Sequence, residues 1–286
     1  MLRAKTVWNL LKETVSSFID DGALSKGASM AFYAATSLAP ILLIVIAVAG
    51  LAFGNAAAQN ALVGQFESMM GHQSAEFLQS ALSNAAGKSS GIFATIVGVV
   101  TLIITASGVF GEMQSALNTI WKADPQGTTV SRLIRARAAS IGLVAALGFL
   151  LLVSLAVSAA VSALGDYVNN WLPFGKFIVS AVNAIISFAL ISVLFAAIYK
   201  VLPDKKLEWR DVIVGAIGTA LLFEIGKSII GWYIGSSAVA STYGAAGALI
   251  VVLLWIYYSS QIFLLGAEFT KAYANFRADN AQIRTV

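Results

Sequence analysis

The segment WRDVIVGAIGTALLFEIGKSIIGWYIG, residues 209–235, decides the class of this protein. It is apolar and long enough to cross a bilayer, since a spanning helix needs about 20 mainly apolar residues. Glu224 and Lys227 lie inside it, and residues three apart share one face of a helix, so the two charges can meet. A charge at mid-membrane costs roughly 2.5–3.5 kcal/mol on insertion scales, and pairing offsets part of this cost. The segment therefore predicts a membrane helix that carries a polar site.

The composition of the whole chain points the same way. Of the 286 residues, 58% are hydrophobic and 11% are charged, whereas about a quarter of the residues in a soluble domain are charged. The chain has no cysteine and one histidine, which argues against thiol catalysis, a histidine-rich metal site and a serine triad. We expect no metal, no cofactor and no enzymatic activity. The net charge of +4 is attributed to membrane orientation and not to nucleic-acid binding.

Five further apolar segments complete a prediction of six transmembrane helices. With the opening segment as span five, the others lie at about 28–53, 91–111, 138–164, 177–199 and 244–267. The segments before, between and after the spans contain 4, 1, 4, 1, 4, 0 and 3 Lys or Arg residues. Because basic residues concentrate on the cytoplasmic side, both termini are predicted to be cytoplasmic. The predicted fold is all-α, a single integral membrane domain with a six-span bundle at 28–268 and a cytoplasmic tail at 269–286.

Shorter helices are expected outside the spans. Residues 1–27 contain an amphipathic pattern that predicts a cytoplasmic helix, either docked on the bundle or lying on the membrane surface. Its apolar positions are Val7, Leu10, Leu11, Val15, Phe18 and Ile19. In the long outer loop between spans one and two, helical periodicity at 57–70 and 74–86 predicts two helices that lie at the outer boundary or cover the bundle.

One group of residues is a candidate for a substrate or ion path. These residues are Glu224, Lys227, Gln261, Pro40 and Ser37. Pro40 is expected to kink span one because it removes a backbone donor, and nearby hydroxyls such as that of Ser37 can bond to freed carbonyls. Two interpretations of Glu224 and Lys227 stay open: a functional polar cavity and a structural ion pair.

A second group lies at predicted cytoplasmic helix ends. Its members are Glu112, Arg132, Arg135, Arg137 and Glu268. Carboxylates at such ends are ordinarily solvated, but these two can also meet the arginines and form a cytoplasmic gate. The arginines either orient the chain or bind anionic lipid head groups.

Three stretches carry a resemblance to a known family: KGASMAFYAATSLAPILLIVIAVAG at 26–50, ASGVFGEMQSALNTIW at 106–121, and TYGAAGALIVVLLWIYYSSQIFLLGAEFTKAY at 242–273. They resemble the YihY/virulence factor BrkB family over nearly the whole chain. The resemblance implies a multi-pass protein of the bacterial inner membrane. Some members are labelled ribonuclease BN, which this sequence does not support because it lacks a cluster of metal-binding carboxylates or histidines. Others are associated with serum resistance and with lipid or lipopolysaccharide traffic.

The leading functional prediction is a transporter or flippase-like protein for a lipid or other amphiphile, with a cavity lined by spans one, five and six. Membrane lipids are its expected partners, together with a second copy of the chain or a protein of envelope biogenesis, and no nucleic acid. The alternatives are an ion-coupled permease or exporter of a small solute and a non-transporting membrane scaffold. A cavity open sideways to lipid favours the first, a closed polar cavity favours the second, and a fully buried ion pair favours the scaffold.

Overall fold

The computed structural model describes residues 4–70, 72–87, 108–123, 175–236 and 239–283, and within these ranges every regular element is a helix. The helices are α1 (Ala4–Asp20), α2 (Ala23–Phe53), α3 (Asn55–Met70), α4 (His72–Gly87), a helix over residues 108–120, α7 (Gly175–Val201), α8 (Trp209–Ser236) and α9 (Val239–Ile283). The all-α prediction is therefore confirmed for the described part of the chain.

Three of the described helices are long and apolar enough to cross a membrane. These stretches are Ser180–Val201 in α7, Trp209–Tyr233 in α8 and Ala246–Asn280 in α9. They correspond to predicted spans four, five and six. Predicted span one lies within α2, whereas span three and most of span two fall outside the described residues. The count of six spans and the orientation of the termini stay predictions.

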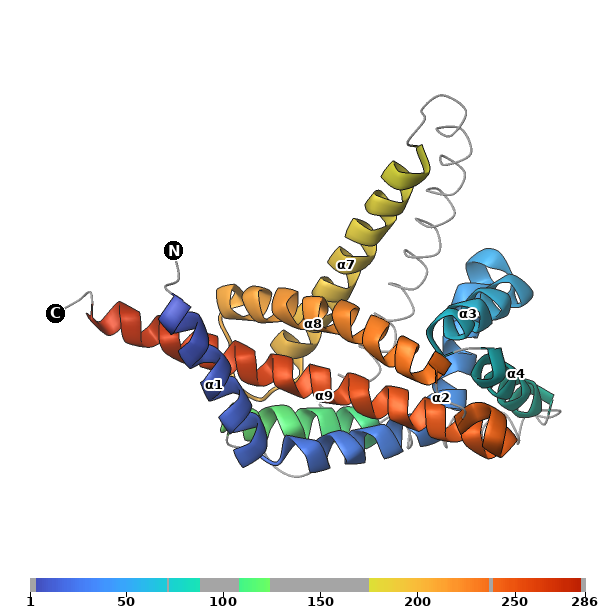
Figure 1. Cartoon of the computed structure of the whole chain (residues 1–286), viewed down its shortest axis with the longest axis horizontal. Helices are drawn as coiled ribbons and strands as arrows, with labels where there is room; N and C mark the ends of the chain where they lie inside the picture. Colours follow the sequence, from blue (N-terminus) through green and yellow to red (C-terminus); the bar gives the residue numbers. More distant parts are fainter. Residues whose placement is uncertain (1–3, 71, 88–107, 124–174, 237–238, 284–286) are drawn as a thin grey trace.

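The centre of the bundle is the packing of α8 against α9 and α7. Figure 1 shows α8 and α9 side by side, with α7 leaning away from them toward its N-terminal end. Gly215 and Gly266 make the approach close, because a Cβ at either position would overlap a side chain of the facing helix. The Tyr199 hydroxyl of α7 donates to the Phe263 carbonyl of α9 at 2.7 Å and lies 3.1 Å from Thr219 Oγ1 of α8. These contacts connect α7, α8 and α9 through a buried polar cluster.

The final helix is longer than the predicted span. The sequence predicts a span that ends near residue 267 and a separate tail, but α9 continues without a break to Ile283. No glycine or proline follows Gly266 in the sequence, so the chain has no strong local signal to end the helix there. The extension gives α1 and the start of α8 a surface on which to pack.

The N-terminal helix docks on this extension. Leu10 and Thr14 are buried and Phe18 packs against the core, whereas Val7, Trp8, Leu11, Val15 and Ile19 are exposed. The predicted apolar face is thus divided between contact with the bundle and an exposed stripe. Gly22 joins α1 to α2 in the left-handed conformation, with φ 66°, which a glycine adopts without the steric cost that a Cβ would add.

At the other end of the bundle, α3 and α4 form a helical cap (Figure 1). They confirm the two helices predicted in the outer loop. Leu62 of α3 and Leu78 and Leu82 of α4 bury against Leu42 and Ile46 of α2. The helix α2 continues through Pro40, and the Ser37 hydroxyl donates to the carbonyls of Tyr33 at 2.8 Å and Ala34 at 3.2 Å.

Candidate functional site

Glu224 and Lys227 form an ion pair on α8, with 2.7 Å between Glu224 Oε2 and Lys227 Nζ. Their side chains are 30% and 37% exposed. The other carboxylate oxygen, Glu224 Oε1, is buried and has no hydrogen-bond partner in the described part of the chain. The pair is therefore neither fully solvated nor fully satisfied, and Glu224 retains capacity to accept a hydrogen bond.

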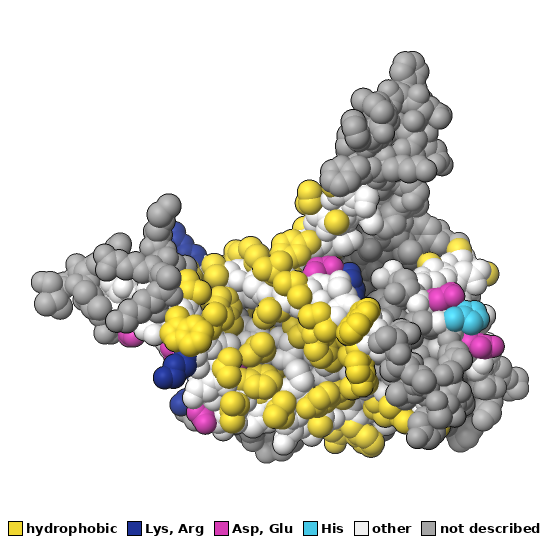
Figure 2. All heavy atoms as spheres, viewed as in Figure 1, with side chains coloured by type: hydrophobic (Ala, Val, Ile, Leu, Met, Phe, Trp, Pro, Cys, Tyr) yellow, Lys and Arg dark blue, Asp and Glu magenta, His cyan; other side chains and the backbone are white. Residues whose placement is uncertain are grey.

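The pair borders an apolar surface. On α8, exposed apolar side chains recur through the helix at Ile213, Val214, Ile217, Leu221, Leu222, Ile225 and Ile229. Trp209 and Trp232 are exposed at its two ends, about 35 Å apart along the axis at 1.5 Å per residue. Figure 2 shows hydrophobic side chains over much of the described surface in this view. Tryptophans that bracket an apolar surface of this length are typical of a helix facing lipid.

The ion pair lies next to a contact between α8 and α7. Phe223, the residue before Glu224, packs edge-on against Phe195 of α7 with 5.9 Å between ring centroids. Beyond this contact α7 leans away from α8 (Figure 1). The exposed neighbours of the pair on α8 are Ile225 and Ser228. Polar and apolar groups therefore adjoin one another on this flank of α8.

The other members of the predicted path do not join the pair. Gln261 of α9 packs against Gly27 of α2, and its Nε2 donates to the Leu24 carbonyl at 3.4 Å. Ser37 is fully buried in α2, where its hydroxyl bonds to its own helix. Pro40 lies in the same helix, three residues further on. The contacts of Gln261 and Ser37 are thus made within or against α2, while the ion pair lies on α8.

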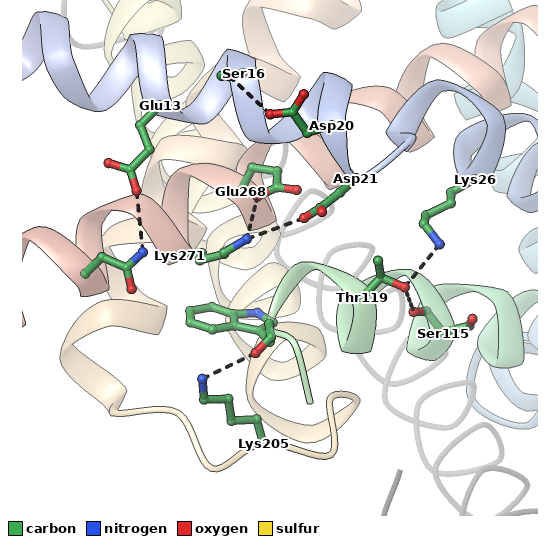
Figure 3. Close-up of polar contacts among 12 residues, drawn as sticks. Glu13, Ser16, Asp20, Asp21, Lys26, Ser115, Thr119, Lys205, Glu268 and Lys271 are labelled. Atoms are coloured by element: carbon green, nitrogen blue, oxygen red, sulfur yellow. Dashed lines mark hydrogen bonds and ion pairs between the residues drawn. The ribbon is translucent and has the colours of Figure 1, made fainter. Parts of the chain in front are cut away.

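Glu268, predicted at a solvated rim, lies inside the bundle. It is 1% exposed, because α9 continues past it and α1 packs on that continuation. Its position along α9 is level with Gly218 and Thr219 of α8, since Phe269 contacts Gly218 and Gly266 contacts Thr219. Figure 3 shows Glu268 and Asp21, from the α1–α2 junction, both turned toward Lys271. Lys271 Nζ is 3.4 Å from Asp21 Oδ2 and 3.7 Å from Glu268 Oε2.

The sequence does not predict this second charged cluster as a whole. Glu268 and Lys271 have the same three-residue spacing as Glu224 and Lys227, so half of the cluster follows from the rule that identified the first pair. Asp21 gives no such signal, because its contact with Lys271 joins residues 250 positions apart.

The rest of the predicted cytoplasmic group is only partly described. Glu112 is half-buried on the helix over residues 108–120. Arg132, Arg135 and Arg137 lie outside the described residues, so the predicted gate stays a prediction. In the ranges that the structure describes, no three His, Cys, Asp or Glu side chains are grouped to hold a metal ion.

Further polar contacts hold the connecting segments at the end of the bundle near α1. Asn118 Nδ2 donates to Asp204 Oδ2 at 2.8 Å, and the Asp204 backbone N–H donates to Asn118 Oδ1 at 2.8 Å. Lys26 Nζ donates to Thr119 Oγ1 at 3.1 Å (Figure 3). Arg277 of α9 bonds to Glu208, and its Nε is 2.9 Å from Asp211 Oδ1. These contacts tie α2 to the 108–120 helix, that helix to the segment before α8, and α9 to the start of α8.

One hollow shares no lining residue with either charged cluster. It has a volume of about 400 Å³ and is lined by residues of α1 and of the end of α9, including Asn9, Glu13, Asn275 and Asp279. Its lining mixes polar and apolar groups, since Leu10 and Phe276 also line it, and Asn275 Nδ2 donates to Glu13 Oε1 at 3.4 Å within it. It is therefore separate from the flank of α8 that holds Glu224 and Lys227.

Comparison with known proteins assigns the chain to a family of membrane proteins. The family model described as Virulence factor BrkB matches residues 14–285. A UPF0761 membrane protein of Alkalilimnicola ehrlichii is 26% identical over 91% of this chain and 57% of its own length. Another, of Alcanivorax borkumensis, is 28% identical over 94% of this chain and 61% of its own length.

A third relative, a UPF0761 membrane protein of Pasteurella multocida, is 33% identical over 63% of this chain and 54% of its own length. The chain thus spans little more than half the length of these relatives. No solved structure matches it. The family match covers the charged residues of both clusters, the apolar helices and the N-terminal helix from Thr14 onward. The chain is a membrane protein and belongs to the virulence factor BrkB family.

Proposed function

We propose that this protein moves a lipid or another amphiphile across the bacterial inner membrane, along the flank of α8 that carries Glu224 and Lys227. In this proposal the chain is a multi-pass, non-enzymatic protein with both termini in the cytoplasm. The observation that carries it is the partly exposed Glu224–Lys227 pair at the border of an apolar, lipid-type surface. An amphiphile needs such a border, because its head group must be solvated while its chains stay in lipid.

The exposure of the pair supports transport over a scaffold role. Placing an ion pair in an apolar medium costs desolvation energy, which a purely structural pair offsets by full burial and complete hydrogen bonding. Here Glu224 Oε1 lacks a partner in the described part of the chain, and about a third of each side chain is exposed. Lys227 is suited to a phosphate group, and Glu224 to an ammonium or hydroxyl group.

The test is movement of labelled anionic phospholipid in vesicles that contain the purified protein. Glu224→Gln and Lys227→Met each remove one charge, and Ile225→Val, at an exposed position between them, is the matched control. A charged hydrogen bond contributes about 1.5–3 kcal/mol, so each charge removal should slow movement roughly ten- to a hundredfold. The control should move lipid at the rate of the unchanged protein.

Exchanging the two charges separates a transport site from a structural pair. The double variant Glu224→Lys, Lys227→Glu keeps an ion pair at the same spacing. It should fold to near-normal stability but move lipid slowly, because the charges now meet the head group in the wrong order. Full recovery of lipid movement in the exchanged variant would assign the pair a structural role. Movement of a small anionic solute in place of lipid would favour a permease.

A further inference from the structure

Glu268 is a buried carboxylate that lacks the hydrogen bonds a buried charge needs. Its side chain is 0% exposed, and neither Oε1 nor Oε2 has a hydrogen-bond partner among the described residues. Leu264 and Ala267 of the same helix are buried in the core beside it. An ionised carboxylate is poorly accommodated in such surroundings, whereas a protonated carboxyl group carries no charge to solvate.

The charges around Glu268 do not balance if it is ionised. Two charged groups act on it, Lys271 from its own helix and Asp21 from the α1–α2 junction. Lys271 lies closer to Asp21, at 3.4 Å, than to Glu268, at 3.7 Å. One ammonium group shared by two carboxylates leaves a net negative charge in a largely buried place. With a proton on Glu268, the Lys271–Asp21 pair is neutral by itself.

Several other charged groups of the adjoining elements have partners away from Glu268. On α1, Glu13 accepts from Asn275 and Asp20 accepts from Ser16. Lys26 of α2 donates to Thr119. Arg277, further along α9, pairs with Glu208 and with Asp211 of α8. Among the described residues, the charged groups that act on Glu268 are Lys271 and Asp21.

We propose that Glu268 is a proton-binding site and that the proton it exchanges is the coupling ion of the transport proposed above, on which this inference rests. Uptake of the proton forms one O–H bond on the Glu268 carboxylate, and its release breaks that bond and returns the proton to water. Release leaves Glu268 and Asp21 to compete for Lys271. The Asp21–Lys271 contact lies next to Gly22, whose left-handed conformation links α1 to α2. A change in this ion pair therefore acts directly on the link between the two helices.

Infrared difference spectroscopy of the full-length protein in lipid nanodiscs tests the proton directly, without reference to transport. A protonated carboxyl group has a C=O band that ionised carboxylates lack. The unchanged protein should show this band near neutral pH, Glu268→Gln should remove it, and Glu13→Gln, at an exposed carboxylate of α1, should leave it. Absence of the band from the unchanged protein near neutral pH would overturn the proposal.

Two neighbouring variants test the proposed surroundings of the proton. Asp21→Asn removes the like charge, so the band should disappear at a lower pH than in the unchanged protein. Lys271→Met removes the opposite charge, so the band should persist to a higher pH. A band that titrates identically in both variants would contradict the cluster, even if Glu268→Gln failed to fold.

The coupling is tested by measuring the rate of lipid movement in vesicles with and without an imposed pH gradient. The gradient should change the rate of lipid movement by the unchanged protein and have no effect on Glu268→Gln. If the unchanged protein moved lipid at the same rate with and without the gradient, the coupling would be overturned and the transport proposal would stay intact. No lipid movement together with a clear carboxyl band would instead overturn the transport proposal and with it the coupling, while retaining the proton site.

Discussion

Gly215 of α8 lies directly against Thr270 of α9, so close that a Cβ on the glycine would overlap the threonine side chain. The Thr270 hydroxyl donates to the Gly266 carbonyl at 2.6 Å, and the Thr219 hydroxyl donates to the Gly215 carbonyl at 2.7 Å. Each helix therefore satisfies its hydroxyl internally and presents a glycine to the other. Small residues permit this close approach of helices in membrane proteins.

The first prediction concerns this contact. Gly215→Ala should lower the free energy of unfolding by about 1–3 kcal/mol, the usual cost of overpacking a filled interior. Denaturant titration in micelles measures this change in the free energy of unfolding. The control is Gly64→Ala in α3, where a Cβ meets nothing within 4 Å and alanine should stabilise the helix by roughly 0.5–1 kcal/mol. Equal stability changes in the two variants would show that α8 and α9 do not pack at Gly215.

The second prediction concerns orientation across the membrane. The chain has no cysteine, so single cysteines can be placed without background. Asn60 in α3 and Asp279 near the end of α9 are both exposed, at opposite ends of the bundle. In right-side-out membrane vesicles, a membrane-impermeant thiol reagent should label Asn60→Cys and leave Asp279→Cys unlabelled until the vesicles are opened. The reverse pattern would invert the predicted topology.

The third prediction concerns the exposed stripe of α1. Its members are Val7, Trp8, Leu11, Val15 and Ile19. An exposed apolar stripe on an amphipathic helix is expected to lie in the membrane interface. A fluorophore on Val15→Cys should be quenched by brominated lipid, whereas one on Ser16→Cys, exposed on a different side of the helix, should be quenched much less. Equal quenching at both positions would argue against an interfacial helix.

The fourth prediction concerns acid stability. The Arg277 side chain, by its hydrogen bond first and its charge second, holds the pKa of Glu208 below the ordinary value of 4.5. Because folding lowers this pKa, the stabilisation is complete above pH 4.5 and is lost as the pH falls through the folded-state pKa. Unfolding midpoints measured across this range should fall less in Arg277→Met than in the unchanged protein.

Lys206→Met is the control for that measurement, because Lys206 is an exposed cation near the start of α8. Its removal changes the net charge by the same amount without touching Glu208. It should keep the acid dependence of the unchanged protein. If Arg277→Met and Lys206→Met behaved alike, the effect would reflect net charge and not the Arg277–Glu208 contact.

Local patterns in the sequence predicted the local features of the structure. The three-residue spacing of Glu224 and Lys227 predicted that they can meet, and their charged groups lie 2.7 Å apart. Periodicity also placed the two helices of the outer loop within two residues of their observed starts. Both features depend only on residues within one or two turns of a helix, which is the range over which spacing rules operate.

Features that depend on tertiary contact were not predicted. Glu268 was expected at a solvated rim because a polar tail follows it, but α1 covers that tail and buries the carboxylate. Gln261 was grouped with Glu224 because both are polar residues within predicted spans, yet it packs on α2. The hydrophobic pattern of a uniformly apolar helix does not indicate which face packs against which neighbour, because every face is apolar.

The proposed lipid movement is tested most directly by the rate at which labelled anionic phospholipid crosses the bilayer of vesicles that contain the unchanged protein. The label on the outer leaflet is destroyed by a membrane-impermeant reductant, and the remaining signal reports lipid that has not crossed. We expect the protected signal to decay faster with protein than in protein-free vesicles of the same composition, in proportion to the protein content. The same decay with and without protein would contradict the proposal that this protein moves lipid.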